Sequence, residues 1–118
     1  MIDTPASPKK TIMILTNTPT IEEYQITHTL GLVSGNMVQS KHIGRDIMAG
    51  LKTIVGGEIE GYTEMLIDAR KKAESRMIHQ AKSQGADAIV NVRFTTSAIA
   101  QGMCELLAYG TAVKIEKR

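Results

Sequence analysis

The residues best suited to metal chemistry are one cysteine and three histidines, namely Cys104, His28, His42 and His79. Soft heavy metals are usually held by two or more thiolates, or by thiolate together with imidazole. The chain contains no Cys-x-x-Cys or His-x-x-x-His spacing. The candidate ligands are therefore His28, His42 and Cys104, which the fold would have to assemble. His28 and Cys104 fall on expected strands and could approach each other, or several chains could each contribute one ligand around an axis.

A purely structural interpretation of these residues stays open. Cys104 fits a small buried apolar residue and His28 a half-buried strand residue. His42 fits a loop before a helix, and His79 fits the solvent face of a helix. The small number of ligands favours this structural interpretation, because a metal site requires a full ligand set.

A catalytic alternative is an enzyme with an active site between subunits that uses Arg45, Asp46 or Asp87. Other acidic residues cluster before an expected helix, where negative charge complements the helix dipole without any chemistry. The segment GGEIEG at residues 56–61 lacks the Lys-Ser/Thr ending and the preceding strand of a phosphate-binding loop. We therefore interpret it as a connection between helices.

Composition places the chain among single-domain globular proteins. It has 118 residues, of which 42% are apolar and 22% charged, with a formal net charge of +2. Only four aromatic residues are present, and no basic cluster accompanies them, so we expect no nucleic-acid partner. A single cysteine fits a reducing compartment, and no apolar run is long enough for a signal or a membrane span, so we expect a cytoplasmic protein.

Hydrophobic periodicity predicts one domain at residues 13–118, after a disordered extension at residues 1–12. Alternation predicts strands at residues 13–15, 24–38, 88–94 and 103–115. Helical spacing predicts helices at residues 43–55 and 62–82, the second ending at Gly85. The small residues at 95–102 predict a turn or loop. In the second strand, alternation puts Tyr24, Ile26, His28, Leu30 and Leu32 on one side.

The element order indicates a two-layer α+β domain with two helices on an antiparallel sheet. The last strand is apolar on both faces, although a two-layer domain buries only one face of its sheet. We therefore expect copies of the chain to cover one another, with Leu106, Ala108 and Ala112 at the interface. The alternative is that long loops of the same chain cover the second face.

Several sequence blocks resemble the YbjQ-like family. They are residues 21–26 (IEEYQI), 31–35 (GLVSG), 45–46 (RD), 56–58 (GGE), 85–90 (GADAIV) and 109–113 (YGTAV). Together they span nearly the whole expected domain. Two departures stand out, because Glu23 stands where the family often has glycine and Asp87 where it often has asparagine.

The resemblance implies a dodecin-like β-α-β-β unit that assembles as a pentameric ring. The family carries a heavy-metal-binding description, although its biochemical role is not established. Together with the residue patterns, this predicts a non-catalytic homo-oligomer of the cytoplasm, without nucleic-acid or membrane partners. It would bind a metal or a small ligand at a subunit interface, and the alternative is an enzyme with an inter-subunit site.

Overall fold

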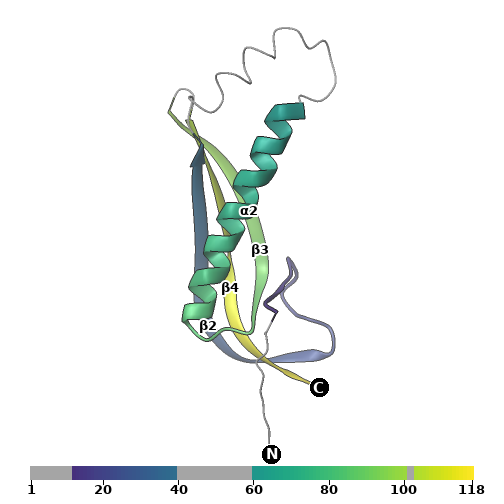
Figure 1. The fold of residues 1–118 in the computed structure, drawn as a ribbon. Helices are drawn as coiled ribbons and strands as arrows, with labels where there is room; N and C mark the ends of the chain where they lie inside the picture. The colour runs from purple at the N-terminus through teal and green to yellow at the C-terminus, as the bar shows by residue number, and fades with distance from the viewer. Residues whose placement is uncertain (1–11, 40–59, 101–102) are drawn as a thin grey trace, which may run out of the picture.

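The computed structural model describes residues 12–39, 60–100 and 103–118, and shows one long helix lying across a twisted sheet (Figure 1). The elements are β1 (Ile14–Leu15), β2 (Tyr24–Gln39), α2 (Glu60–Ser83), β3 (Ala88–Ala100) and β4 (Met103–Lys117). The α+β class is confirmed. The predicted helix at residues 43–55 and most of the predicted extension, residues 1–11, lie outside the described residues.

The sheet is mixed, so the prediction of a purely antiparallel sheet was wrong. Its strand order is β1-β3-β4-β2, with β4 antiparallel to both long neighbours. The two residues of β1 run parallel to β3, with Ile14 beside Ala88. A parallel pair needs a long connection, and here the chain supplies one, because β2 and α2 both lie between β1 and β3 in sequence.

Helix α2 confirms the predicted alanine face. Ala69, Ala73, Met77 and Ala81 are fully buried against the sheet. The helix ends as predicted, because Gly85 adopts a φ of 80° and donates its N–H to the carbonyl of Lys82. Ala86 donates to the carbonyl of Ala81, which completes a Schellman motif.

Contact between helix and sheet is closest at Gly35 of β2. A Cβ atom at this position would collide with the backbone of α2 at Ala73 and Met77. The missing side chain therefore allows the helix to approach β2, and Val33 beside it is buried in the same core.

Two register shifts in β2 overturn the simple alternation predicted for this strand. They lie between Ile26 and His28 and between Thr29 and Gly31. Because each inserted residue reverses the alternation of side chains, Leu30 packs into the core beneath α2, whereas Ile26 packs on the other face. Leu32, which alternation placed with both, is 72% exposed.

The hairpin of β3 and β4 is longer than predicted. Residues 95–100 continue β3 instead of forming a turn, and Thr95 to Ala98 pair with Leu107 to Cys104. The small and polar residues of this segment predict a loop. Backbone hydrogen bonds to β4 hold the segment in a strand, and amino-acid composition does not reveal such bonds.

The two faces of the sheet are covered differently. α2 covers one face, where Ala108 and Ala112 of β4 are fully buried. On the opposite face, a small cluster around Ala88, Val90 and Val113 is covered by isoleucines of the same chain, including Ile21. The rest of this face, which we call the open face, carries the apolar residues Leu32, Val38, Met103, Leu107 and Tyr109, with Ser34, Asn36 and Glu105 among them.

Leu106, Ala108 and Ala112, the predicted interface residues, lie on the face that α2 covers. They are 5%, 0% and 0% exposed in a single chain. A second copy is therefore not needed to bury them, and the reason for placing them between subunits no longer holds. The predicted split of β4 into two apolar faces does occur, but the uncovered face is that of Leu107 and Tyr109.

Candidate functional site

The two described candidate ligands, His28 and Cys104, do not converge within one chain. His28 lies opposite Lys114 in the sheet register, whereas Cys104 lies opposite Gln39. Lys114 and Cys104 are ten positions apart along β4, which corresponds to roughly 33 Å. His42 lies outside the described residues. Within the described part of the chain, no three His, Cys, Asp or Glu side chains are grouped to hold a metal ion.

Each described candidate has an ordinary local environment. The His28 ring is exposed, and its Nδ1 lies 3.1 Å from the Thr27 hydroxyl oxygen. His79 lies on the exposed side of α2. Cys104 is a half-buried free thiol.

A buried amide beside Cys104 escaped the sequence analysis. Gln39 is 5% exposed, and among the described residues its Oε1 has no hydrogen-bond partner. Leaving a buried acceptor unpaired costs about 1–3 kcal/mol. Gln39 and Cys104 are partners in the sheet register, so their side chains project from the same face at this end of the sheet. No sequence spacing signals this pair, because 64 residues separate its members in the chain.

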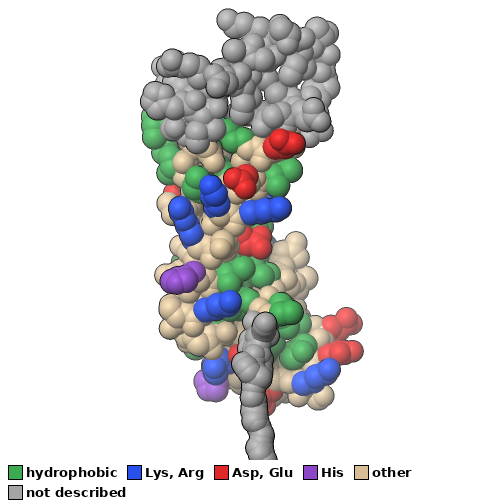
Figure 2. Space-filling view, viewed as in Figure 1, with side chains coloured by type: hydrophobic (Ala, Val, Ile, Leu, Met, Phe, Trp, Pro, Cys, Tyr) green, Lys and Arg blue, Asp and Glu red, His purple; other side chains and the backbone are tan. Residues whose placement is uncertain are grey.

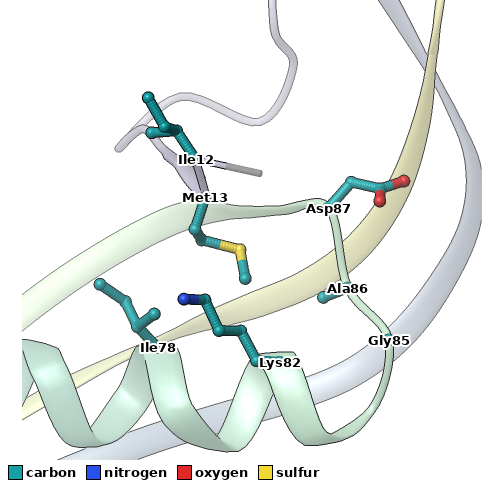
Figure 3. A pocket seen from close by; sticks show the side chains of 7 residues that line it. All are labelled: Ile12, Met13, Ile78, Lys82, Gly85, Ala86 and Asp87. Atoms are coloured by element: carbon teal, nitrogen blue, oxygen red, sulfur yellow. The ribbon is translucent and has the colours of Figure 1, made fainter. Parts of the chain in front are cut away.

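The larger cavity lies where the C-terminal end of α2 meets the start of β1. It has a volume of about 770 Å³ and is lined by Ile12, Met13, Ile78, Lys82, Gly85, Ala86 and Asp87. Figure 3 shows the Lys82 amine reaching toward Met13, while the Asp87 carboxylate points away from it. The cavity thus offers apolar walls and one cationic group.

Asp87, from the catalytic alternative, has a structural role in this region. Its Oδ2 accepts the backbone N–H of Ile115 at 3.0 Å, and its own N–H donates to the Val113 carbonyl at 2.9 Å. These bonds fasten the turn after α2 to β4. Arg45 and Asp46, the other residues of that alternative, lie outside the described residues.

A second, smaller cavity of about 460 Å³ lies between α2, β1 and β3. Its arginine, Arg93, donates from Nη1 to the backbone carbonyls of Asn17 at 2.9 Å and Val92 at 3.1 Å. Phe94 lines the same cavity and is 47% exposed. The sequence analysis did not single out either residue, since a lone arginine before a phenylalanine is common in strands.

The charges on the helix side of the molecule are mixed. Figure 2 shows Lys and Arg side chains interleaved with Asp and Glu over α2. One such pair is Lys72 and Asp68, whose Nζ and Oδ2 atoms are 3.7 Å apart. This face therefore carries no field of a single sign. α2 also lacks the apolar stretch with few charges that a bilayer-crossing helix requires, and none is found elsewhere in the described residues.

Comparison with known proteins identifies close relatives. The sequence model of a family described as "Putative heavy-metal-binding" matches residues 13–116. A UPF0145 protein of Photobacterium profundum is 67% identical over 103 residues, covering 87% of this chain and 100% of that protein. A UPF0145 protein of Archaeoglobus fulgidus is 60% identical over 103 residues, covering 87% and 95%.

One solved structure matches the fold. It is a protein of unknown function from Pediococcus pentosaceus, of the DUF74 family, with a TM-score of 0.58. The match covers 88% of this chain and 98% of that chain at 16% sequence identity. At this identity the similarity supports the fold alone.

The Glu23 position, where the sequence departs from the family pattern, has an unusual backbone. Glu23 has a φ of 72°, in the left-handed region that glycine occupies without strain. The turn is held by a bond from the Tyr24 N–H to the Ile21 carbonyl at 3.1 Å. The local geometry explains why glycine is common there.

Proposed function

Since the chain belongs to the YbjQ family, as its sequence blocks predicted, we propose that it is a non-catalytic homo-oligomer of the cytoplasm. Each copy covers the open face of a neighbouring copy, and a metal ion or a small ligand binds at a subunit interface. The expected assembly is a ring of five, which follows from the family resemblance.

The observation that carries this proposal is the open face. Leu32 is 72% exposed, Val38 41% and Met103 36%, with Leu107 and Tyr109 half buried between them. α2 lies on the opposite side of the sheet, so no described helix shields these side chains (Figure 1). Full burial of a leucine contributes about 1.5–3 kcal/mol, so covering these exposed apolar side chains favours association. Asn36 and Glu105 lie among them and are joined to each other by a 3.0 Å hydrogen bond.

The oligomer proposal is tested by the mass of the protein in solution. Analytical ultracentrifugation at falling concentration should show an assembly that Leu32→Lys dissociates, because a charge replaces apolar surface at the contact. His79→Lys is the matched control, since it adds the same charge on the exposed side of α2. A folded wild-type chain that sediments as a 12.8 kDa monomer at every concentration would disprove the proposal.

The metal proposal rests on different residues. In an assembly, Cys104, on the α2 side of the sheet near the start of β4, can contribute one thiolate per chain, and Gln39 is its register partner on β2. Thiolate is the protein ligand that heavy metals prefer, and copies around an axis would supply the number of ligands that one chain lacks.

Cadmium binding separates the candidate ligands. After dialysis against Cd²⁺, the Cys104→Ser variant should contain much less bound cadmium than wild type. The His28→Ala and His42→Ala variants should show a smaller decrease. His79→Ala should retain all of it. Equal cadmium content in wild type and Cys104→Ser would remove the metal proposal and leave the oligomer proposal intact.

A further inference from the structure

The two long edges of the sheet differ in how their outward backbone groups are satisfied. On β2, side chains of α2 reach over the edge. The Ser34 N–H donates to Gln80 Oε1 at 2.7 Å, and Arg76 Nη1 donates to the Asn36 carbonyl at 2.6 Å. These bonds occupy positions that another strand would need, so this part of β2 is protected against edge-to-edge pairing.

The lower part of the β3 edge is also occupied. Thr16 donates its N–H to the Ile89 carbonyl at 3.1 Å, and Val92 donates to the Thr16 carbonyl at 3.0 Å. Asn91 donates to the Thr18 carbonyl at 3.0 Å. The segment that contains β1 therefore acts as the neighbouring strand as far as Val92.

Beyond Val92, no described segment runs beside β3. The Val92 N–H points away from β4. Because the backbone groups of successive strand residues point to alternate sides, those of Phe94, Thr96 and Ala98 also point away from β4. All residues from 93 to 100 are exposed, with Phe94 at 47% and Ile99 at 51%. Residues 94–100 contain no charged residue and no proline, the usual devices that protect an edge strand.

We propose that residues 94–100 of β3 pair antiparallel with the same residues of a second copy, joining two sheets into one. This inference rests on the proposed self-association and assigns it a surface distinct from the open face. A matching strand must itself have free backbone groups along several residues. Within the described residues, β1 is two residues long and β2 is bonded to α2 at Ser34 and Asn36, whereas the same β3 edge on a second copy meets the requirement.

The pairing has a natural centre at Ser97. With Ser97 opposite its counterpart, Thr96 faces Ala98 of the other copy. Both are outward residues, so each pair can exchange both backbone hydrogen bonds, and the register shift between Ala98 and Ala100 ends the regular pairing there. No charged side chains are brought opposite each other, because residues 94–100 carry none.

Proline at an outward position tests the edge itself. Thr96→Pro removes an outward N–H that the chain's own ladder with β4 does not use, so the subunit should fold and lose the edge contact. Thr96→Val retains the N–H and serves as the matched control. Ultracentrifugation should show at least a tenfold weaker association for Thr96→Pro, with both variants folded by circular dichroism.

Outcomes distinguish this inference from the proposed function. If Leu32→Lys dissociates the assembly but folded Thr96→Pro associates like Thr96→Val, the edge pairing is overturned and the open-face contact stands. A monomeric wild type overturns both. If Thr96→Pro fails to fold, cross-linking decides the question.

Cross-linking tests the register without disturbing the strand. Ser97→Cys in a Cys104→Ser background should form an inter-chain disulfide under mild oxidation, because facing residues of a non-hydrogen-bonded pair lie about 4.5 Å apart between Cα atoms. Ser75→Cys in the same background, on the exposed side of α2, is the control. Cross-linking of Ser97→Cys no faster than that of Ser75→Cys would overturn the antiparallel pairing.

Discussion

The two faces of β4 differ in the size of their side chains and in what covers them. Facing α2, its side chains are mainly small, and Ala108 and Ala112 pack without exposure against a helix that itself presents Ala73 and Ala81. On the other face, Leu107 and Tyr109 remain half buried, and Leu32 of β2 is exposed farther along the same face, opposite Thr111. Small residues allow a helix to lie close, whereas large apolar residues on an uncovered face provide area for association.

The largest contrast should come from placing one charge on each face. Ala108→Asp puts an unpaired carboxylate beneath α2, which should lower the free energy of unfolding by about 3–5 kcal/mol. Leu107→Asp puts the same group on the open face and should change the stability of the subunit by about 1 kcal/mol or less. Urea denaturation of both variants measures the difference. Equal losses would show that the faces are not distinct.

The contact between α2 and β2 depends on the absence of a side chain at Gly35. Gly35→Ala should lower the free energy of unfolding by about 3 kcal/mol, because the added Cβ collides with backbone that cannot rotate away. Ser34→Ala, on the neighbouring residue, removes an exposed hydroxyl and should have little effect. Thermal unfolding followed by circular dichroism compares the two. A Gly35→Ala variant as stable as Ser34→Ala would mean that the helix lies farther from the sheet.

The protection of the β2 edge by α2 is a smaller effect. Gln80→Ala removes the acceptor for the Ser34 N–H and should lower the free energy of unfolding by about 1 kcal/mol. His79→Ala, on the adjacent exposed residue, should have no comparable effect. Amide hydrogen exchange should show faster exchange of the Ser34 N–H in Gln80→Ala only. Unchanged exchange would mean that the bond does not protect the edge.

The smallest effect concerns the turn that brings Ile21 against the cluster of Val90 and Val113. Glu23→Gly should raise the free energy of unfolding by about 0.5 kcal/mol, because relief of the left-handed backbone slightly exceeds the entropy that glycine loses on folding. Glu22→Gly, one residue earlier, should lower it. Urea denaturation of the pair provides the measurement, and a destabilising Glu23→Gly would refute the strain argument.

Sequence patterns recovered the elements that depend on local periodicity. The buried alanines of α2, its end at Gly85 and the two apolar faces of β4 were all predicted. The same reasoning missed the bulges of β2, because an inserted residue reverses a strand's alternation without any change in composition. It also missed the pairing of Gln39 with Cys104, which depends on contact between distant strands.

The sequence by itself determined that this chain has an alanine-faced helix, a two-faced apolar strand and a place in the YbjQ family. Only the tertiary structure decided which face of the strand the helix covers. A period of two distinguishes the faces from each other but does not say which one is inside. That choice depends on Gly35 of a different strand, where the absence of a Cβ lets the backbone of α2 come close, and it left Leu107 and Tyr109 on the open face.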